Sequence, residues 1–217
     1  MTQTFPWQLI TVDIDGTLTL KHGWREIAVA FHRLPAYEAT NRRFNAHEVG
    51  EDDHLAELLN VTTGHTVREV EVVVERTPKL AGIAAGINRL HELGARVALL
   101  THNPTYVVEW YRRTFGFDDA EGVAAQTVTH GLIGPPVGAR ADKPGGMRAL
   151  LARFELPSSS AVHIGDGASD AEVFRQVGAG VAVNSPLPEV NRAADLALST
   201  EDFRDVVEGI ARLTPRE

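Results

Sequence analysis

Residues 9–17 read LITVDIDGT, a short apolar run that ends in two aspartates, a glycine and a threonine. The β-branched residues and the abrupt polar stop are typical of a buried strand followed by a loop. Asp13 and Asp15 are separated by one residue, so on an extended chain their side chains point to the same side. Two such carboxylates are unfavourable unless a cation or a proton lies between them, and Mg²⁺ suits an oxygen-rich site. Gly16 allows a turn with positive φ and Thr17 can anchor the loop. The alternative is a simple turn cluster after a strand.

Three further apolar runs of this kind follow along the chain. They are ARVALLTHN (95–103), SAVHIGDGASD (160–170) and GAGVAVN (178–184). Between and after them the apolar spacing predicts helices over 79–93, 104–115, 144–155, 170–177 and 201–213. Strands that alternate with helices predict an α/β fold, a parallel sheet covered on both faces. In such a sheet the ligand site lies beyond the carboxyl ends of the strands.

Residues 19–78 break this alternation. They are more polar and their spacing is helical, although VEVVVE (70–75) also fits a strand. The sequence therefore predicts a discontinuous core domain, 1–18 and 79–217, with a small helical domain, 19–78, inserted after the first strand.

Composition narrows the class of function. The 217 residues include 21 Lys and Arg, 29 Asp and Glu and no cysteine, for a net charge of −8. The missing thiols exclude disulfides, thiolate metal sites and cysteine nucleophiles. The negative charge argues against a general grip on nucleic acid. With no basic and apolar leader and no long apolar run, we expect a cytoplasmic protein, monomer or homodimer, with no membrane partner.

A second acidic loop, GDGASD (165–170), follows the third apolar run. Asp166 is flanked by two glycines, which a structural cap does not explain. Asp170 lies at or near a helix start, where it also fits an ordinary N-cap.

Two more polar positions suit a phosphate group. Thr101 ends the second run, and a hydroxyl with backbone N–H groups at a helix start can cradle a phosphate. Lys143 precedes a helix, where its ammonium can neutralise a phosphate. Taken singly, a threonine here is often a cap and a lysine is often a surface residue.

The ordered set VDIDGT, LLT, DKP and IGDGASD resembles the haloacid dehalogenase superfamily of aspartate-nucleophile phosphohydrolases. The segment AEVFRQVGAGVAVNS (171–185) is similar to its phosphoserine-phosphatase-like branch. The resemblance implies a three-layer, Rossmann-like core with a small helical cap after the first strand. It implies a Mg²⁺-dependent phosphatase that hydrolyses a small phosphomonoester through an aspartyl-phosphate.

The resemblance also implies a role for each matching residue. Asp13 would be the nucleophile, and Asp15 the acid that protonates the leaving alcohol and then activates water. The phosphoryl group would be held by Thr101, His102, Asn103 and Lys143. Asp13, Asp166 and the Asp15 carbonyl would bind Mg²⁺, while Asp170 would support the metal shell or position Lys143.

The chain departs from that branch where the substrate is chosen. His22 stands nine residues after Asp13, where those phosphatases carry a Glu for the substrate amine. No Lys or Arg lies between Asn45 and Val67, where they use an Arg for the substrate carboxylate. Thr101-His102-Asn103 replaces their Ser-Gly-Gly. We therefore expect a changed substrate, with His22 and Thr17 as candidate specificity residues.

Several interpretations stay open. The chain fits an authentic phosphoserine phosphatase with a divergent cap, or a phosphotransferase or mutase on sugars. From another class, a receiver-like signalling module and a non-catalytic binding relative also remain. We expect the acidic run 48–53 to be a solvated helix start, Trp24 and Phe44 to serve packing, and His163 to be a core histidine.

Overall fold

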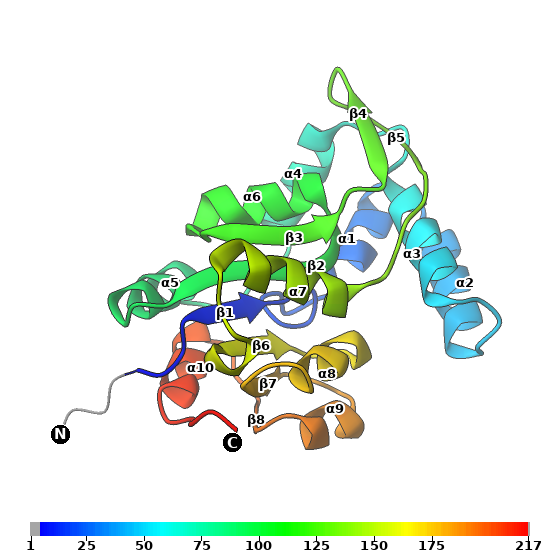
Figure 1. Ribbon diagram of the computed structural model, residues 1–217. Helices are drawn as coiled ribbons and strands as arrows, with labels where there is room; N and C mark the ends of the chain where they lie inside the picture. Colours follow the sequence, from blue (N-terminus) through cyan, green and yellow to red (C-terminus); the bar gives the residue numbers. More distant parts are fainter. Residues whose placement is uncertain (1–4, 217) are drawn as a thin grey trace.

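The computed structural model describes residues 5–216, and within them a six-stranded parallel sheet has the order β3-β2-β1-β6-β7-β8 (Figure 1). The strands are β1 (Leu9–Val12), β2 (Arg96–Pro104), β3 (Asp119–Val123), β6 (Ala161–Gly165), β7 (Ala179–Val183) and β8 (Leu196–Leu198). The chain builds outward from β1 to one side and then, from β6, to the other. Ligand sites of doubly wound sheets lie where the order reverses in this way. Because β1 and β6 are neighbours there, with Val12 opposite Ile164, the two acidic loops leave the sheet side by side.

Helices cover both faces of this sheet, which confirms the predicted three-layer α/β core. One layer holds α5 (Ile83–Glu92), α6 (Thr105–Phe115) and α10 (Phe203–Ile210), and the other holds α7 (Lys143–Phe154), α8 (Ala168–Phe174) and α9 (Pro188–Ala193). Alternate residues of β1 serve the two layers: Ile10 and Val12 belong to the cluster with α5, α6 and α10, whereas Leu9 packs with Met147 and Leu150 of α7. No helix in the described part of the chain is long and apolar enough to cross a membrane.

The insert after β1 is helical, as predicted. It consists of α1 (Gly23–Ala30), α2 (Leu34–Asn45), α3 (Glu51–Leu59), the short 3₁₀ helix η1 (Asn60–Thr62) and α4 (Val67–Arg76). The ambiguous VEVVVE segment lies in α4, which starts with a capping box in which Glu69 N donates to Thr66 Oγ1 at 3.2 Å and Thr66 N donates to Glu69 Oε2 at 2.7 Å. That start signal decides for a helix. The division into domains at 18/19 and 78/79 stays a prediction.

A hairpin that the sequence did not reveal lies beside these helices. Strands β4 (Gln126–Thr129) and β5 (Leu132–Pro136) follow β3 and pair antiparallel. The hairpin touches the start of α4, where Thr66 bridges Leu132 and Val67 N donates to Gly131 O at 2.8 Å. The β4–β5 hairpin, which lies outside residues 19–78 in the sequence, therefore packs beside the inserted helices, next to α4 in Figure 1.

Candidate active site

The loop after β1 sends its two carboxylates to different partners. Asp13 is buried, and its backbone N–H donates to Ile164 O of β6 at 2.9 Å. Asp15 accepts from Gly23 N of α1 at 2.5 Å through Oδ1 and from Asn103 Nδ2 at 2.9 Å through Oδ2. Asp13 thus faces the second acidic loop, while Asp15 is held between the start of α1 and the end of β2.

Gly16 makes this turn possible. Its φ is +76°, in the left-handed region, and a Cβ at this position would collide with the carboxylate of Asp166. Thr17, which is 1% exposed, donates from Oγ1 to Asp166 Oδ1 at 3.2 Å. The DIDGT turn therefore brings β1 against the loop that follows β6.

A buried lysine links the two acidic loops. Lys143 Nζ lies 2.9 Å from Asp13 Oδ2 and 2.5 Å from Asp170 Oδ1, and its side chain is 3% exposed. Burial alone would lower the pKa of Lys143, but the charges of Asp13 and Asp170 raise it well above its usual value. The lysine is therefore a fixed cation, held at the start of α7.

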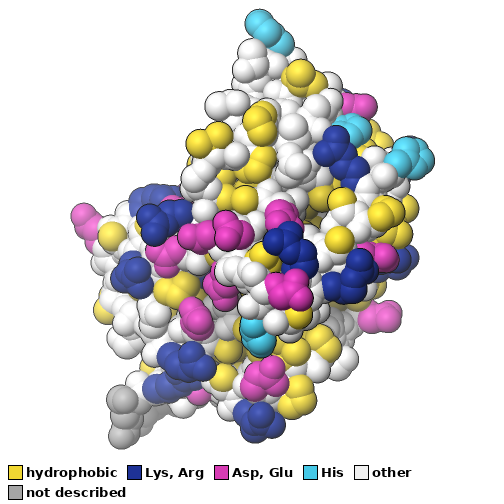
Figure 2. Space-filling model, turned by 90° about the vertical axis from the view of Figure 1, so that its right-hand side faces the viewer, with side chains coloured by type: hydrophobic (Ala, Val, Ile, Leu, Met, Phe, Trp, Pro, Cys, Tyr) yellow, Lys and Arg dark blue, Asp and Glu magenta, His cyan; other side chains and the backbone are white. Residues whose placement is uncertain are grey.

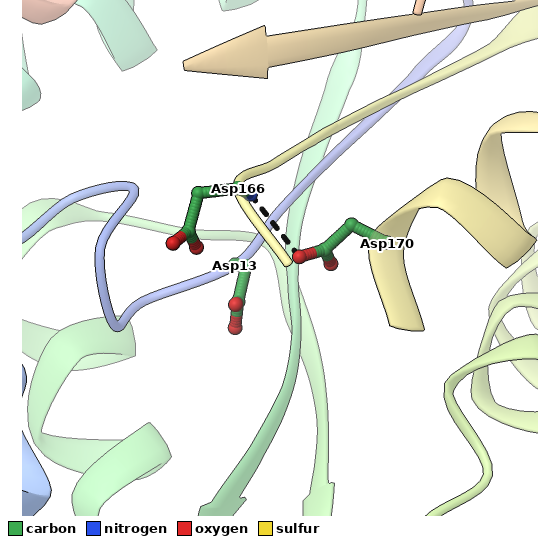
Figure 3. Close-up of side chains that lie close together, drawn as sticks. All are labelled: Asp13, Asp166 and Asp170. Atoms are coloured by element: carbon green, nitrogen blue, oxygen red, sulfur yellow. Dashed lines mark hydrogen bonds between the residues drawn. The ribbon is translucent and has the colours of Figure 1, made fainter. Parts of the chain in front are cut away.

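Asp170 has a partner at each oxygen. Oδ1 is 2.8 Å from His163 Nε2 and is also bonded to Lys143. Oδ2 accepts from Gly167 N at 2.9 Å and from Asp166 N at 3.1 Å, the second of which is the dashed line in Figure 3. Burial opposes ionisation, yet Lys143 and then His163 hold the pKa of Asp170 well below its usual range. Asp170 is thus a satisfied anion that fixes Lys143 and the second loop, and His163 is a core histidine with a structural partner.

Asp13 and Asp166 remain short of positive charge. Asp13, Asp166 and Asp170 present oxygens within 4.8 Å of one another (Figure 3). Burial first, and then the charges of Asp13 and Asp170, raise the pKa of Asp166 to about 8. Burial also raises the pKa of Asp13, although Lys143 opposes this. Crowded, buried, oxygen-only donors of this kind fit a hard divalent cation.

The end of β2 positions the third polar group. Asn103 Nδ2 donates to Thr101 Oγ1 at 3.1 Å as well as to Asp15, so both amide hydrogens are used inside the protein. The Asn103 side chain therefore holds Asp15 and Thr101, and contact of Asn103 with phosphate stays a prediction. His102 Nε2 is buried without a hydrogen-bond partner, and burial, then Lys143, lowers the pKa of this ring to about 4.

One cavity of about 250 Å³ brings most of the predicted residues together. Its lining includes Asp13, Asp15, His22, Thr101, His102, Asn103, Lys143, Asp166 and Asp170. Thr17 is not among the lining residues, and its hydroxyl is bonded to Asp166. Thr17 therefore supports Asp166, and its part in specificity stays a prediction.

The cavity also has lining residues that the sequence did not identify. Trp24 of α1, Phe44 of α2 and one face of α3 contribute, the last through Glu51, His54, Leu55 and Leu58. Trp24 also packs in a buried cluster and Glu51 is exposed in the first turn of α3, as expected, so lining the cavity is an additional role for both. The spacing of 51, 54, 55 and 58 predicts a shared helix face, but not which surface that face meets.

The fold and the buried carboxylate–lysine site define a protein of the doubly wound α/β class with its candidate reaction centre at the carboxyl ends of the strands. Residues 7–178 match the haloacid dehalogenase-like hydrolases, and the chain belongs to this family. It is 33% identical over 164 residues to the phosphoserine phosphatase of Streptomyces coelicolor, covering 74% of this chain and 38% of that one. It is 25% identical over 195 residues to phosphoserine phosphatase SerB2 of Mycobacterium tuberculosis, covering 88% and 47%. The chain thus spans about half the length of these curated relatives or less.

Solved structures agree on the fold. A phosphoserine phosphatase solved with a phospho-aspartyl intermediate analogue superposes with a TM-score of 0.79 at 20% identity, covering 94% of this chain and 98% of that one. A haloacid dehalogenase family hydrolase of Salmonella enterica serovar Typhi reaches 0.85 at 16% identity, covering 95% and 72%. At these identities the likeness concerns the fold alone.

Proposed function

We propose that the protein is a Mg²⁺-dependent phosphatase that hydrolyses a small phosphomonoester through an aspartyl-phosphate on Asp13. The observation that carries this proposal is a cluster of two buried carboxylates, Asp13 and Asp166, in which Asp13 is also bound by the fixed ammonium of Lys143, with the Asp15 carboxylate lining the same cavity. Phosphoryl transfer needs mainly positioning and charge neutralisation, and these residues supply both. The phosphatase names of the curated relatives point in the same direction.

In the first half-reaction, a carboxylate oxygen of Asp13 attacks phosphorus and the bond from phosphorus to the alcohol oxygen breaks. Asp15 gives its proton to the departing oxygen, so that a neutral alcohol leaves. In the second half-reaction, Asp15 takes a proton from water, which attacks phosphorus and releases inorganic phosphate and the Asp13 carboxylate. Lys143 and the Thr101 hydroxyl bind the phosphoryl oxygens, while Asn103 orients Asp15 and Thr101.

Asp13, Asp166 and the Asp15 backbone carbonyl are the groups that would hold Mg²⁺. When bound, the ion neutralises the carboxylates and the charge of the phosphoryl group. Asp170, already paired with Lys143, positions that lysine and the loop of Asp166.

Trapping the intermediate tests this proposal. Replacing Asp15 by Asn removes the group that activates water, so the Asp15→Asn variant should accumulate the acyl-phosphate on Asp13. We expect wild-type protein to turn over p-nitrophenyl phosphate with Mg²⁺. In acid-quenched Asp15→Asn, peptide mass spectrometry should find one phosphoryl group on residue 13. Phosphorylation at another residue, or wild-type protein that keeps its phosphate as a receiver-like module would, contradicts the proposal.

The helical region 19–78 is proposed as the cap domain that covers the site and selects the substrate. The predictions of a cytoplasmic location and of a monomer or homodimer stay predictions.

On the face at the carboxyl ends of the strands, basic and acidic side chains are interspersed (Figure 2), which agrees with a small-molecule substrate better than with nucleic acid.

A further inference from the structure

The cavity is apolar on the side away from the carboxylates. Trp24, Phe44, Leu55 and Leu58 line it from α1, α2 and α3, and Ala141 lines it from the loop before α7. Trp24 and Leu55 are 6% and 3% exposed and pack in one cluster, so this wall is part of a preformed apolar core. Because Asp13 lines the same cavity, a phosphomonoester bound with its phosphoryl group at Asp13 would have this wall beside its alcohol part.

No free Lys or Arg lines this cavity in the described part of the chain. Lys143 is the one Lys or Arg among the described lining residues, and both Asp13 and Asp170 bind its ammonium. His54 stacks on Phe44 with ring centroids 4.2 Å apart and lies 3.1 Å from Asn41 Oδ1. Burial lowers the pKa of His54, which favours the neutral ring. Among the described residues, a substrate carboxylate would therefore find no free Lys or Arg beside Trp24, Leu55 and Leu58, and His22 is the exposed histidine of the lining.

Acidic groups stand at the edge of the same cavity. Glu51, at the start of α3, lines it, and burial, then the charges of Glu172 and Asp52, raise the pKa of Glu51. Asp52 accepts a hydrogen bond from Ala141 N at 2.8 Å, which ties α3 to the loop before α7. An anionic alcohol part would therefore meet like charges as well as an apolar wall.

We infer that the preferred substrate is the phosphomonoester of a small apolar alcohol that carries no carboxylate, with Trp24, Phe44, Leu55 and Leu58 as its binding surface. This inference rests on the proposed phosphatase function. Burying a carboxylate without a partner is strongly unfavourable, whereas burying aliphatic surface is favourable. The cavity volume of about 250 Å³ restricts the alcohol to a small one.

Two isosteric esters test the inference directly. 3-Methylbutyl phosphate and 3-phosphonooxypropanoate differ in an isopropyl group against a carboxylate of nearly the same shape. We expect kcat/KM to be higher for the methylbutyl ester by at least about 100-fold. O-phosphoserine should resemble the carboxylate ester. Equal values, or a preference for either carboxylate ester, would overturn the inference.

Acetyl phosphate separates failure of this inference from failure of the proposed function, because its acyl group is too short to use the apolar wall. If the protein hydrolyses acetyl phosphate but not 3-methylbutyl phosphate, the inferred substrate class is wrong and the proposed phosphatase function stands. No turnover of any ester with Mg²⁺ overturns both.

A charge placed in the wall should change the preference. Leu58→Arg gives a substrate carboxylate a partner, so we expect the ratio of the two kcat/KM values to move by at least about 10-fold towards the carboxylate ester. Because both values come from one preparation, the ratio does not depend on the fraction of folded protein. Val137→Arg adds the same charge at a residue that is 78% exposed and outside the cavity lining, and should leave the ratio unchanged. A ratio that is the same in Leu58→Arg and wild type contradicts the inference.

Discussion

The two sides of the cavity differ in the physical interactions that hold them. On the core side, Asp13, Asp166, Asp170 and Lys143 are buried groups that come from three separate strand–helix connections, and the ammonium of Lys143 binds both Asp13 and Asp170. On the cap side, Trp24, Leu55 and Leu58 come from neighbouring helices and are held by apolar packing, and Phe44 stacks on His54. A charge network loses its balance when one member is removed, whereas an apolar wall tolerates substitutions that keep its volume. Substitutions on the core side should therefore damage reaction and folding, while those on the cap side should change the choice of substrate.

The largest expected effect is the loss of the nucleophile. Asp13→Asn keeps the shape of the side chain but removes the charge that attacks phosphorus, so kcat for p-nitrophenyl phosphate should fall by about 10⁴-fold or more. The measurement is steady-state turnover with Mg²⁺, with circular dichroism as the control for folding. A folded Asp13→Asn variant that retains a tenth of the activity would place the nucleophile elsewhere.

Removal of the shared cation should damage folding as well as catalysis. In Lys143→Met, the carboxylates of Asp13 and Asp170 stay buried without their common partner, so the free energy of unfolding should fall by about 3–5 kcal/mol. Urea unfolding of both proteins gives this difference. Lys21→Met, at an exposed position, is the matched control and should change the free energy by less than about 0.5 kcal/mol. An equally small change for Lys143→Met would mean that the core-side charges are not mutually dependent.

The core side was predictable from sequence because its residues follow strands. Parallel strands bring their carboxyl ends to one edge, so Asp13, Thr101 and Asp166 had to meet, and Lys143 at a helix start joined them. The partners of each side chain were not predictable. The Asn103 amide donates to Asp15 and Thr101, and the Thr17 hydroxyl donates to Asp166. These bonds depend on side-chain rotamers, which the spacing of residues in the sequence does not encode.

The cap side was predictable only as a set of helices. The spacing on α3 marks one face, but the surface it meets is set by how α1, α2 and α3 pack over the sheet edge. The sequence does not predict the β4–β5 hairpin, because its strands are short. Val128 and Leu132 are exposed, so the strands show no clear alternation of buried apolar and exposed polar residues. Tertiary contact, rather than local preference, determines this half of the site.

Metal removal should make stability depend on pH through Asp166. Without a cation its pKa is about 8 in the folded chain, against about 3.8 in the unfolded chain. Between these values the folded state holds a proton that the unfolded state has released. Stability should therefore fall as pH rises through this window, by at most about 1.4 kcal/mol per pH unit.

Calorimetry in EDTA from about pH 5 to about pH 9 measures this slope, and added Mg²⁺ should raise Tm most at the alkaline end. Asp166→Asn has no titrating carboxyl group at this position, so it should lose both the slope and the response to Mg²⁺. Identical pH profiles for wild type and variant would show that Asp166 is not the crowded carboxylate.

A smaller effect is expected where the two sides meet. Asn103 and the backbone N–H of Gly23, the first residue of α1, together hold Asp15. Asn103→Ala removes one of these bonds, so Asp15 should give its proton less efficiently and kcat should fall by about 10- to 100-fold. KM should change by less than about 3-fold, because the Asn103 side chain does not bind substrate. Steady-state kinetics separates the two parameters. A large rise in KM with unchanged kcat would instead assign Asn103 to substrate binding.

The smallest effect tests whether the fold of the cap can be weakened without touching the reaction. Thr66 caps α4 through Glu69, away from the cavity lining, and this capping box selects a helix for a valine-rich segment that would also suit a strand. Thr66→Ala leaves the N–H of Glu69 without its acceptor and should lower the free energy of unfolding by about 1 kcal/mol. Thr66→Ser retains the hydroxyl and should restore most of it. Because the cap-side residues lie on α1, α2 and α3, the preference between apolar and carboxylate esters should be the same in both variants. If Thr66→Ala changes that preference, the position of α4 contributes to the apolar wall, and the cap acts as one cooperative unit rather than as separate helices.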